Sequence, residues 1–137
     1  MDHSKCAALK AALADLPEPP IIPIERYFDG NDDPASIGCN LPNHPGVGEF
    51  ARIITGLLTR PDVHSVYAMI AELDPGEDYW PFTDTILVMG AISPEELLTV
   101  VRSLQPSEVL RSTETGISPD LIQKYAHGQP ILAIWWD

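Results

Sequence analysis

Apolar residues recur at helical spacing in three stretches of the chain. The first stretch places Cys6, Leu9, Leu13 and Leu16 on one stripe, which predicts an N-terminal helix capped by Ser4. Two later stretches have the same spacing: Val47, Phe50, Ile54, Leu57 and Leu58, then Leu97, Leu98, Val101 and Leu104. Three amphipathic helices are therefore expected, each with one face in the core.

Strand-like patterns lie around these helices. Residues 63–73 are apolar at both odd and even positions, which is typical of a sheet strand that is covered on both faces. Residues 83–90 and 130–136 predict two further strands. Shorter strands are expected over residues 24–28 and 36–41.

Proline and serine mark where several of these elements begin. Four prolines within residues 17–23 exclude a helix there and predict an extended strap. Ser93 and Glu96 form a capping-box sequence at the start of a helix. The pair Ser118-Pro119 predicts the start of one more short helix before the last strand.

The order of these elements predicts the class of fold. We expect one α+β domain over residues 1–137, with a helix over 1–16, a strap over 17–23 and a core over 24–137. The core order of strand, helix, two strands, helix and final strand predicts a ferredoxin-like, split βαβ two-layer sandwich. Another α+β sandwich, in which residues 24–28 pair as an extra strand, is the alternative.

The charge of the chain narrows the classes of partner. Its 137 residues include 20 Asp and Glu but only 8 Lys and Arg, for a formal net charge of −12. Binding to nucleic acid or to an anionic membrane surface requires basic residues, so we expect neither partner. No apolar run approaches the roughly 20 residues that a membrane-spanning helix needs.

The two cysteines, Cys6 and Cys39, do not form a disulfide framework or a zinc motif. We expect both thiols to be reduced, in a cytoplasmic protein without a secretory signal. Cys39 with His44 is a conceivable nucleophile and base, but a cysteine inside a strand lacks the helix start that lowers a thiol pKa. No catalytic residue is therefore assigned.

One loop resembles the first half of a calcium-binding loop. Asp29, Asn31 and Asp33 alternate as oxygen ligands should. The pattern then fails, because Pro34 stands where the motif needs glycine and Asn40 stands where it needs glutamate. We therefore expect no metal and no cofactor, and an acidic turn whose side chains bond to their own backbone is the simpler interpretation.

Two acidic segments, one of them with aromatic residues, are candidates for binding a partner protein. Aromatic residues within a polar rim are typical of interface hot spots, although such rings also close the open end of a small core. The candidate residues are Asp29, Asn31, Asp32, Asp33, Glu77, Asp78, Tyr79, Trp80 and Asp84. The adjacent Trp135 and Trp136 should point to opposite faces of the last strand, one of them into the core.

Five strings along the chain carry a resemblance to a known family. They are Phe28-Asp-Gly-Asn-Asp-Asp33, Ser36-Ile-Gly-Cys-Asn-Leu41, His44-Pro-Gly46, Trp80-Pro-Phe-Thr-Asp-Thr85 and Leu104-Gln-Pro-Ser-Glu-Val109. Over about residues 24 to 110 the chain resembles a family of small, largely uncharacterised bacterial proteins, some of which look like toxin-neutralising immunity proteins. The resemblance does not cover the first helix or the strap, and it implies no catalytic residues.

These observations favour a protein-binding function. The first hypothesis is an immunity protein that occludes the basic cleft of a cognate toxin, acting as a monomer or homodimer. The second is a small metal- or ligand-binding domain built on Asp29, Asn31, Asp32, Asp33, Cys39, Asn40 and Asp84. The third is a regulatory domain that forms a homodimer through its sheet.

Overall fold

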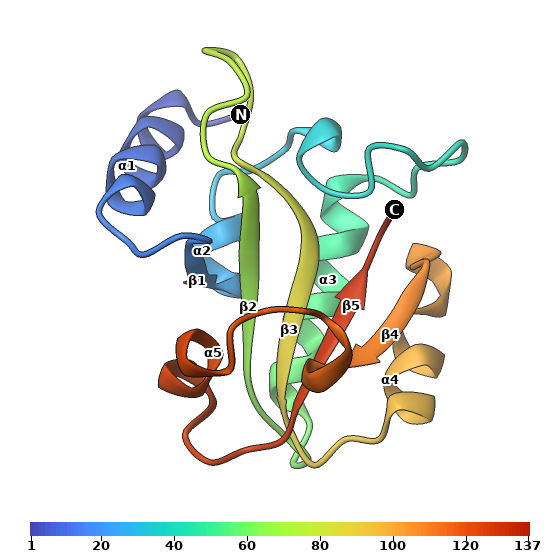
Figure 1. Cartoon of the computed structure of the whole chain (residues 1–137). Coiled ribbons are helices and arrows are strands. Elements are labelled where there is room, and N and C mark those ends of the chain that lie inside the picture. The colour runs from blue at the N-terminus through green and yellow to red at the C-terminus, as the bar shows by residue number, and fades with distance from the viewer.

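The computed structural model describes residues 1–137 and is built around a five-stranded antiparallel sheet (Figure 1). Along the sheet the strands follow the order β1-β2-β3-β5-β4. Their bounds are β1 Ile21–Pro23, β2 Val63–Glu72, β3 Phe82–Gly90, β4 Glu108–Arg111 and β5 Ile131–Trp135. The two long strands, β2 and β3, form the central hairpin of the sheet.

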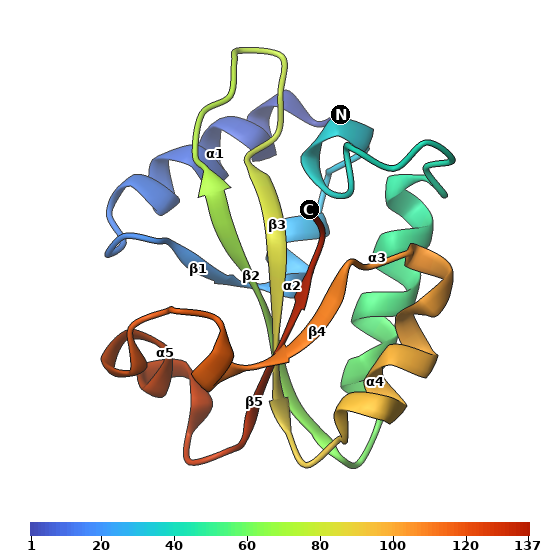
Figure 2. The same cartoon turned by 45° about the vertical axis from the view of Figure 1, so that its right-hand side comes forward.

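Helices cover both faces of this sheet. Their bounds are α1 His3–Ala14, α2 Ile24–Phe28, α3 Val47–Gly56, α4 Pro94–Val101 and α5 Pro119–Ala126. Helices α3 and α4 lie on one side and α5 on the other (Figure 2). Four short 3-10 turns, η1 Pro34–Ser36, η2 Leu57–Thr59, η3 Arg102–Leu104 and η4 Ser112–Glu114, join or extend these elements. None of the helices is both long and apolar enough to cross a membrane.

The strand alternation divides the core into two clusters. Ile86 and Val88 of β3 join the larger cluster, which also includes Phe50 of α3 and Leu97 of α4. Leu87 belongs to the smaller cluster, whose other buried members come from the strands and α5: Ile21, Met89, Ile122, Ala126, Ile131 and Ala133. β3 is buried at every position from Thr85 to Gly90, and its run from Ile86 to Met89 is accordingly apolar. On β2, for which covering on both faces was predicted, Val66, Ala68 and Ile70 are buried, whereas Tyr67 and Met69 on the other face are half-buried.

The predicted α+β class is confirmed: α3 and α4 form one layer against the sheet, α5 covers part of the other face, and a split βαβ unit lies in the C-terminal half. β5 pairs antiparallel with both β3 and β4, so β3 and β4 run parallel with β5 between them and α4 as their connection. The predicted strands over residues 63–73, 83–90 and 130–136 correspond to β2, β3 and β5. The strand β4 was missed, because only Val109 and Leu110 of its four residues are apolar.

The predicted strand over residues 24–28 is wrong, because this segment is helix α2. Ile24, Tyr27 and Phe28 are all buried, at the three-to-four-residue spacing of a helix. The short edge strand is instead β1, in the proline-rich strap, where Ile22 pairs with Ala68 of β2. The strap is therefore extended, as predicted, and it lies against the sheet.

The predicted strand over residues 36–41 is also wrong. Only Ile37 makes a strand-type bridge, to Thr83 of β3, and the chain then turns at Gly38. Gly38 has φ +65°, and a Cβ there would lie 2.7 Å from Cζ of Phe50. Only glycine fits this turn without strain. Because the backbone leaves the extended conformation at Gly38, residues 39–41 do not continue as a strand.

Serine was predicted to cap three helices, at Ser4, Ser93 and Ser118, and only Ser93 makes the predicted cap bond. Ser93 accepts a hydrogen bond from the Glu96 amide at 3.1 Å, as the capping box predicts. Ser118 begins α5 without a side-chain cap bond. The cap of α1 is Asp2, whose carboxylate accepts from the Lys5 amide at 3.0 Å, and not Ser4.

Candidate functional site

The connection between β2 and β3, residues 73–81, projects beyond the end of the sheet, and we call it the acidic hairpin (Figures 1 and 2). Glu77 and Asp78 at its tip are exposed, and Tyr79 is 50% exposed. These are three of the nine predicted partner-binding residues. The hairpin therefore presents two carboxylates and one aromatic ring to solvent.

The tip has a defined shape because Gly76 and Tyr79 lie against each other. The Tyr79 amide donates to the Gly76 carbonyl at 3.2 Å, which closes the turn. Gly76 has φ +154°, and a Cβ there would lie 2.8 Å from Cδ2 of Tyr79. Only a glycine leaves room for the tyrosine ring in this position.

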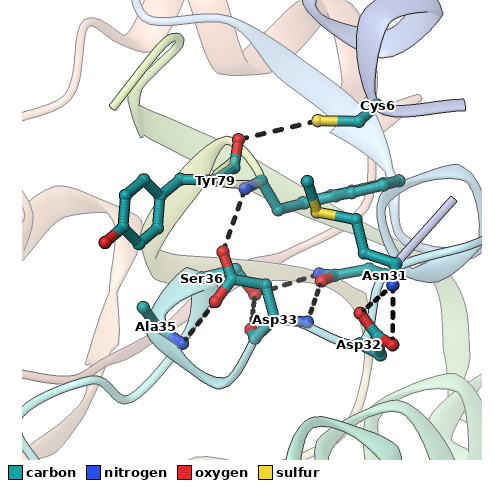
Figure 3. A network of polar contacts seen from close by, with 9 residues as sticks. Cys6, Asn31, Asp32, Asp33, Ala35, Ser36 and Tyr79 are labelled. Atoms are coloured by element: carbon teal, nitrogen blue, oxygen red, sulfur yellow. Dashed lines mark hydrogen bonds and ion pairs between the residues drawn. The ribbon is translucent and has the colours of Figure 1, made fainter. Parts of the chain in front are cut away.

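Helix α1 holds the hairpin from one side. Lys10 Nζ donates to Asp74 Oδ1 at 2.9 Å and to the Gly76 carbonyl at 2.8 Å. The Lys10 ammonium lowers the pKa of Asp74, mainly through this hydrogen bond. The Cys6 thiol points to the Tyr79 carbonyl at 3.6 Å, and burial raises the pKa of this thiol (Figure 3).

Asp33 holds the hairpin from the other side. Its Oδ1 accepts from the Ala35 amide at 2.9 Å, and its Oδ2 accepts from the Trp80 amide at 3.0 Å (Figure 3). Asn31 donates to Ser36 Oγ at 3.0 Å and accepts from the Asp33 amide at 2.9 Å. Asp33 and Asn31, both predicted to contact a partner, are thus bonded within the chain.

The two remaining acids of this loop pair with cations at the start of the chain. Asp29 contacts Lys5 Nζ at 2.7 Å, and Asp32 contacts the amino group of Met1 at 2.7 Å. Hydrogen bonding to that amine lowers the pKa of Asp32, and hydrogen bonding to Asp29 raises the pKa of Lys5. The acidic loop therefore attaches the N-terminal segment to the rest of the fold.

Trp80 does not lie where a partner could contact it. The prediction that this indole anchors an interface is wrong, because Trp80 is only 1% exposed. Its Nε1 is buried without a hydrogen-bond partner. The neighbouring Pro81 carbonyl lies 2.8 Å from the buried Tyr27 hydroxyl, which also contacts the Ser36 carbonyl at 2.9 Å. Burial raises the pKa of Tyr27.

The residues of the metal-binding hypothesis fall into two separate groups. Asp29, Asn31, Asp32 and Asp33 form the bonded loop, and no three His, Cys, Asp or Glu side chains are placed to share a metal ion. Three other members, Cys39, Asn40 and Asp84, line a crevice of about 20 Å³ near the chain end.

Cys39 and His44 do not form a nucleophile–base pair. His44 Nε2 contacts the Ile37 carbonyl at 2.8 Å, and its Nδ1 accepts from the Gly46 amide at 2.9 Å. Backbone groups therefore occupy both ring nitrogens. Because Nε2 faces a carbonyl oxygen, Nε2 carries the ring proton. The exposed Cys39 thiol instead contacts Asn40 Oδ1 at 3.8 Å.

Sequence reasoning missed a groove of about 410 Å³ on the α5 face of the sheet. Its lining residues are Met69, Asp84, Thr85, Leu110, Glu114, Thr115, Ile117, Ala133 and Trp135. The sequence feature that could have indicated this groove is the adjacent pair Trp135 and Trp136. Trp136 is buried and donates to the Leu104 carbonyl at 2.9 Å, so the part-exposed Trp135 must face the other way, into this groove.

The fold and these contacts define a small α+β protein with an anchored acidic hairpin and no assigned chemistry. The chain belongs to the Uncharacterized protein YfbO family, whose model matches residues 4–130. The match includes α1 and the strap, which the sequence resemblance did not cover.

A curated relative in this family comes from Escherichia coli (strain K12). It is described as "Uncharacterized protein YfbO" and is 26% identical over 124 residues, which are 90% of this chain and 86% of the relative. No solved structure matches the chain.

Proposed function

We propose that this protein binds and neutralises a toxin-like partner protein by inserting its acidic hairpin into a basic cleft. The observation that carries the proposal is the exposed tip, Glu77, Asp78 and Tyr79, on a loop whose backbone is bonded to α1 and to Asp33. A projecting loop of this kind fits a concave partner surface. A cytoplasmic location accords with two free thiols.

Preorganisation makes such a loop an effective binder. Ordering a flexible loop on binding costs free energy, and a loop that is already held in one shape avoids most of that cost. Lys10 contacts the hairpin at Asp74 and at the Gly76 carbonyl, and neither of the tip carboxylates, Glu77 and Asp78, forms an ion pair within the chain. Opposite charges on the two partners increase the association rate and exclude neutral or acidic competitors.

The test begins with capture of the partner. The tagged protein is purified from its own host and is also co-expressed with the product of the adjacent gene. The proposal predicts a stoichiometric complex and relief of the toxicity of that product. The double variant Glu77→Lys plus Asp78→Lys should weaken the complex by roughly a hundredfold, because like charges then meet across the interface. Tyr79→Ala should weaken it by roughly tenfold or more.

The matched control reverses two carboxylates that are exposed elsewhere. Asp15→Lys plus Glu18→Lys makes the same change in net charge at the C-terminal end of α1 and in the strap. This control should retain binding. If both double variants bind equally well, or if the protein is recovered only with itself, the hairpin is not the binding element and the proposal fails.

A further inference from the structure

The groove on the α5 face combines an apolar wall with unneutralised negative charge. Met69, Leu110 and Trp135 are part-exposed there, and Asp84 and Glu114 are its only charged lining residues. No lysine or arginine lines the groove. An apolar surface with carboxylates and no cation attracts a group that carries a positive charge and also has a flat or apolar face.

Both carboxylates retain bonding capacity. Glu114 Oε1 accepts from the Arg111 amide at 3.0 Å, and Asp84 Oδ1 accepts from the Thr85 hydroxyl at 2.9 Å. These bonds fix the two side chains, and the second oxygen of each carboxylate has no hydrogen-bond partner within the chain. Each side chain is thus positioned but can still accept from a ligand.

A third acid lies beside the indole. Glu108 is paired in register with Trp135 across β4 and β5, so their side chains leave the sheet on the same face. Glu108 is exposed and forms no ion pair. A cation that stacks on the Trp135 ring would therefore approach negative charge from several sides.

We infer that this groove accepts an arginine side chain from an otherwise apolar segment of the partner protein. A guanidinium group is planar, stacks on an indole ring and bonds a carboxylate through two N–H groups, which an ammonium group cannot match. The groove is open along one side, so it fits a side chain presented by a macromolecule better than a free small molecule, which needs enclosure.

The groove lies on the two strands that carry the acidic hairpin. Asp84 and Thr85 of its lining lie on β3 near the end of the hairpin, and Met69 lies on β2 before the hairpin begins. This inference rests on the proposed function, because that proposal supplies a partner protein with basic residues. It adds a second, separate contact and names the side chain that occupies it.

The three tryptophans provide a built-in test. Trp80 and Trp136 are 1% and 4% exposed, so only the Trp135 indole is open to a ligand. The nitrogen-15-labelled full chain is titrated with acetyl-Leu-Arg-Leu-amide, and the three indole N–H signals are followed by NMR. The expected result is a saturable shift of the Trp135 signal at roughly millimolar peptide, with the other two signals unchanged. The same peptide with neutral citrulline in place of arginine should bind at least about fivefold more weakly.

Conservative variants then test the carboxylates. Glu114→Gln and Asp84→Asn keep an oxygen for the Arg111 amide and the Thr85 hydroxyl, respectively, but remove the charge. Each should raise the Kd for the arginine peptide by about three- to fivefold. Glu95→Gln on α4, which also removes one exposed carboxylate, should leave the Kd unchanged.

Three results would overturn the inference. They are equal binding of the citrulline peptide, equal binding of free argininamide, and a Trp135 shift that depends on protein concentration alone, which indicates a second copy in the groove. The partner complex separates this inference from the proposed function. If hairpin variants abolish binding and groove variants do not, the proposed function stands and the groove inference fails.

Discussion

Asp33 shows how much of this site depends on one side chain. Its two carboxylate oxygens accept from the Ala35 and Trp80 amides, which are far apart in sequence but adjacent in the fold. One oxygen caps the η1 turn, and the other holds the end of the acidic hairpin. The simpler interpretation of the acidic loop, that its side chains bond to their own backbone, describes the bond to Ala35 but not the bond to Trp80, which lies 47 residues away in sequence.

Replacing Asp33 should therefore cost stability and loosen the hairpin. Asp33→Ala leaves two backbone N–H groups without their acceptor, and we expect a loss of about 2 kcal/mol in the free energy of unfolding, measured with urea. Amide exchange in the hairpin should also become faster. Asp32→Ala is the control and should have a much smaller effect, because its exposed ion pair is screened by water. Equal losses in the two variants would contradict this account.

The two cysteines should differ sharply in reactivity. Cys6 is buried, and burial raises its pKa, so little reactive thiolate forms at neutral pH. Cys39 is exposed. Titration of the native protein with a thiol-reactive dye should show one fast and one slow phase. Cys39→Ser should remove the fast phase, whereas Cys6→Ser should leave it intact.

At the scale of elements, the sequence pattern predicts those helices and turns that are held by bonds between residues close together in the chain. Helix α4 begins where its capping box predicts, because Ser93 and its partner amide are three residues apart. The missed strand β4 and the wrong strand over residues 36–41 depend on distant residues. Gly38 turns the chain beneath the Phe50 ring, and no pattern around Gly38 contains that ring. The groove likewise needed the arrangement of β3, β4 and β5.

The two serine-proline helix starts offer a matched comparison. Ser93→Ala removes a real cap bond and should lower the free energy of unfolding by about 1 kcal/mol. Ser118→Ala removes no side-chain bond and should change it by only a few tenths of a kcal/mol. Urea unfolding of the two variants beside the parent chain measures both effects. A larger loss of stability in the Ser118 variant would contradict the finding that Ser93, and not Ser118, makes a cap bond.

At the scale of the whole molecule, four ion pairs with a lysine, an arginine or the amino terminus lower carboxylate pKa values and contribute to the response of stability to acid. Asp32, Glu49, Asp62 and Asp74 each have a pKa below the ordinary range, mainly because a cationic partner donates a hydrogen bond. A lowered pKa in the folded state adds stability above the ordinary carboxylate pKa, near 4. That contribution is lost as the pH falls through the lowered values.

The free energy of unfolding should therefore stay high at neutral pH and fall below about pH 4. Lys10→Met removes the cation that lowers the pKa of Asp74, so the variant should lose less stability between pH 4 and pH 2 than the parent chain does. Urea unfolding at several pH values measures both slopes. Identical slopes would show that the Lys10–Asp74 pair adds no pH-dependent stability in solution.

The two residues of α1 that contact the acidic hairpin differ in their other roles. Cys6 is buried in the larger core cluster, whereas Lys10 belongs to neither cluster and contacts the hairpin through its ammonium group. A substitution of Lys10 can therefore alter the presentation of Tyr79 while the core keeps its packing. Under the proposed function, related chains can then vary how the tip is presented to a partner without rebuilding their core.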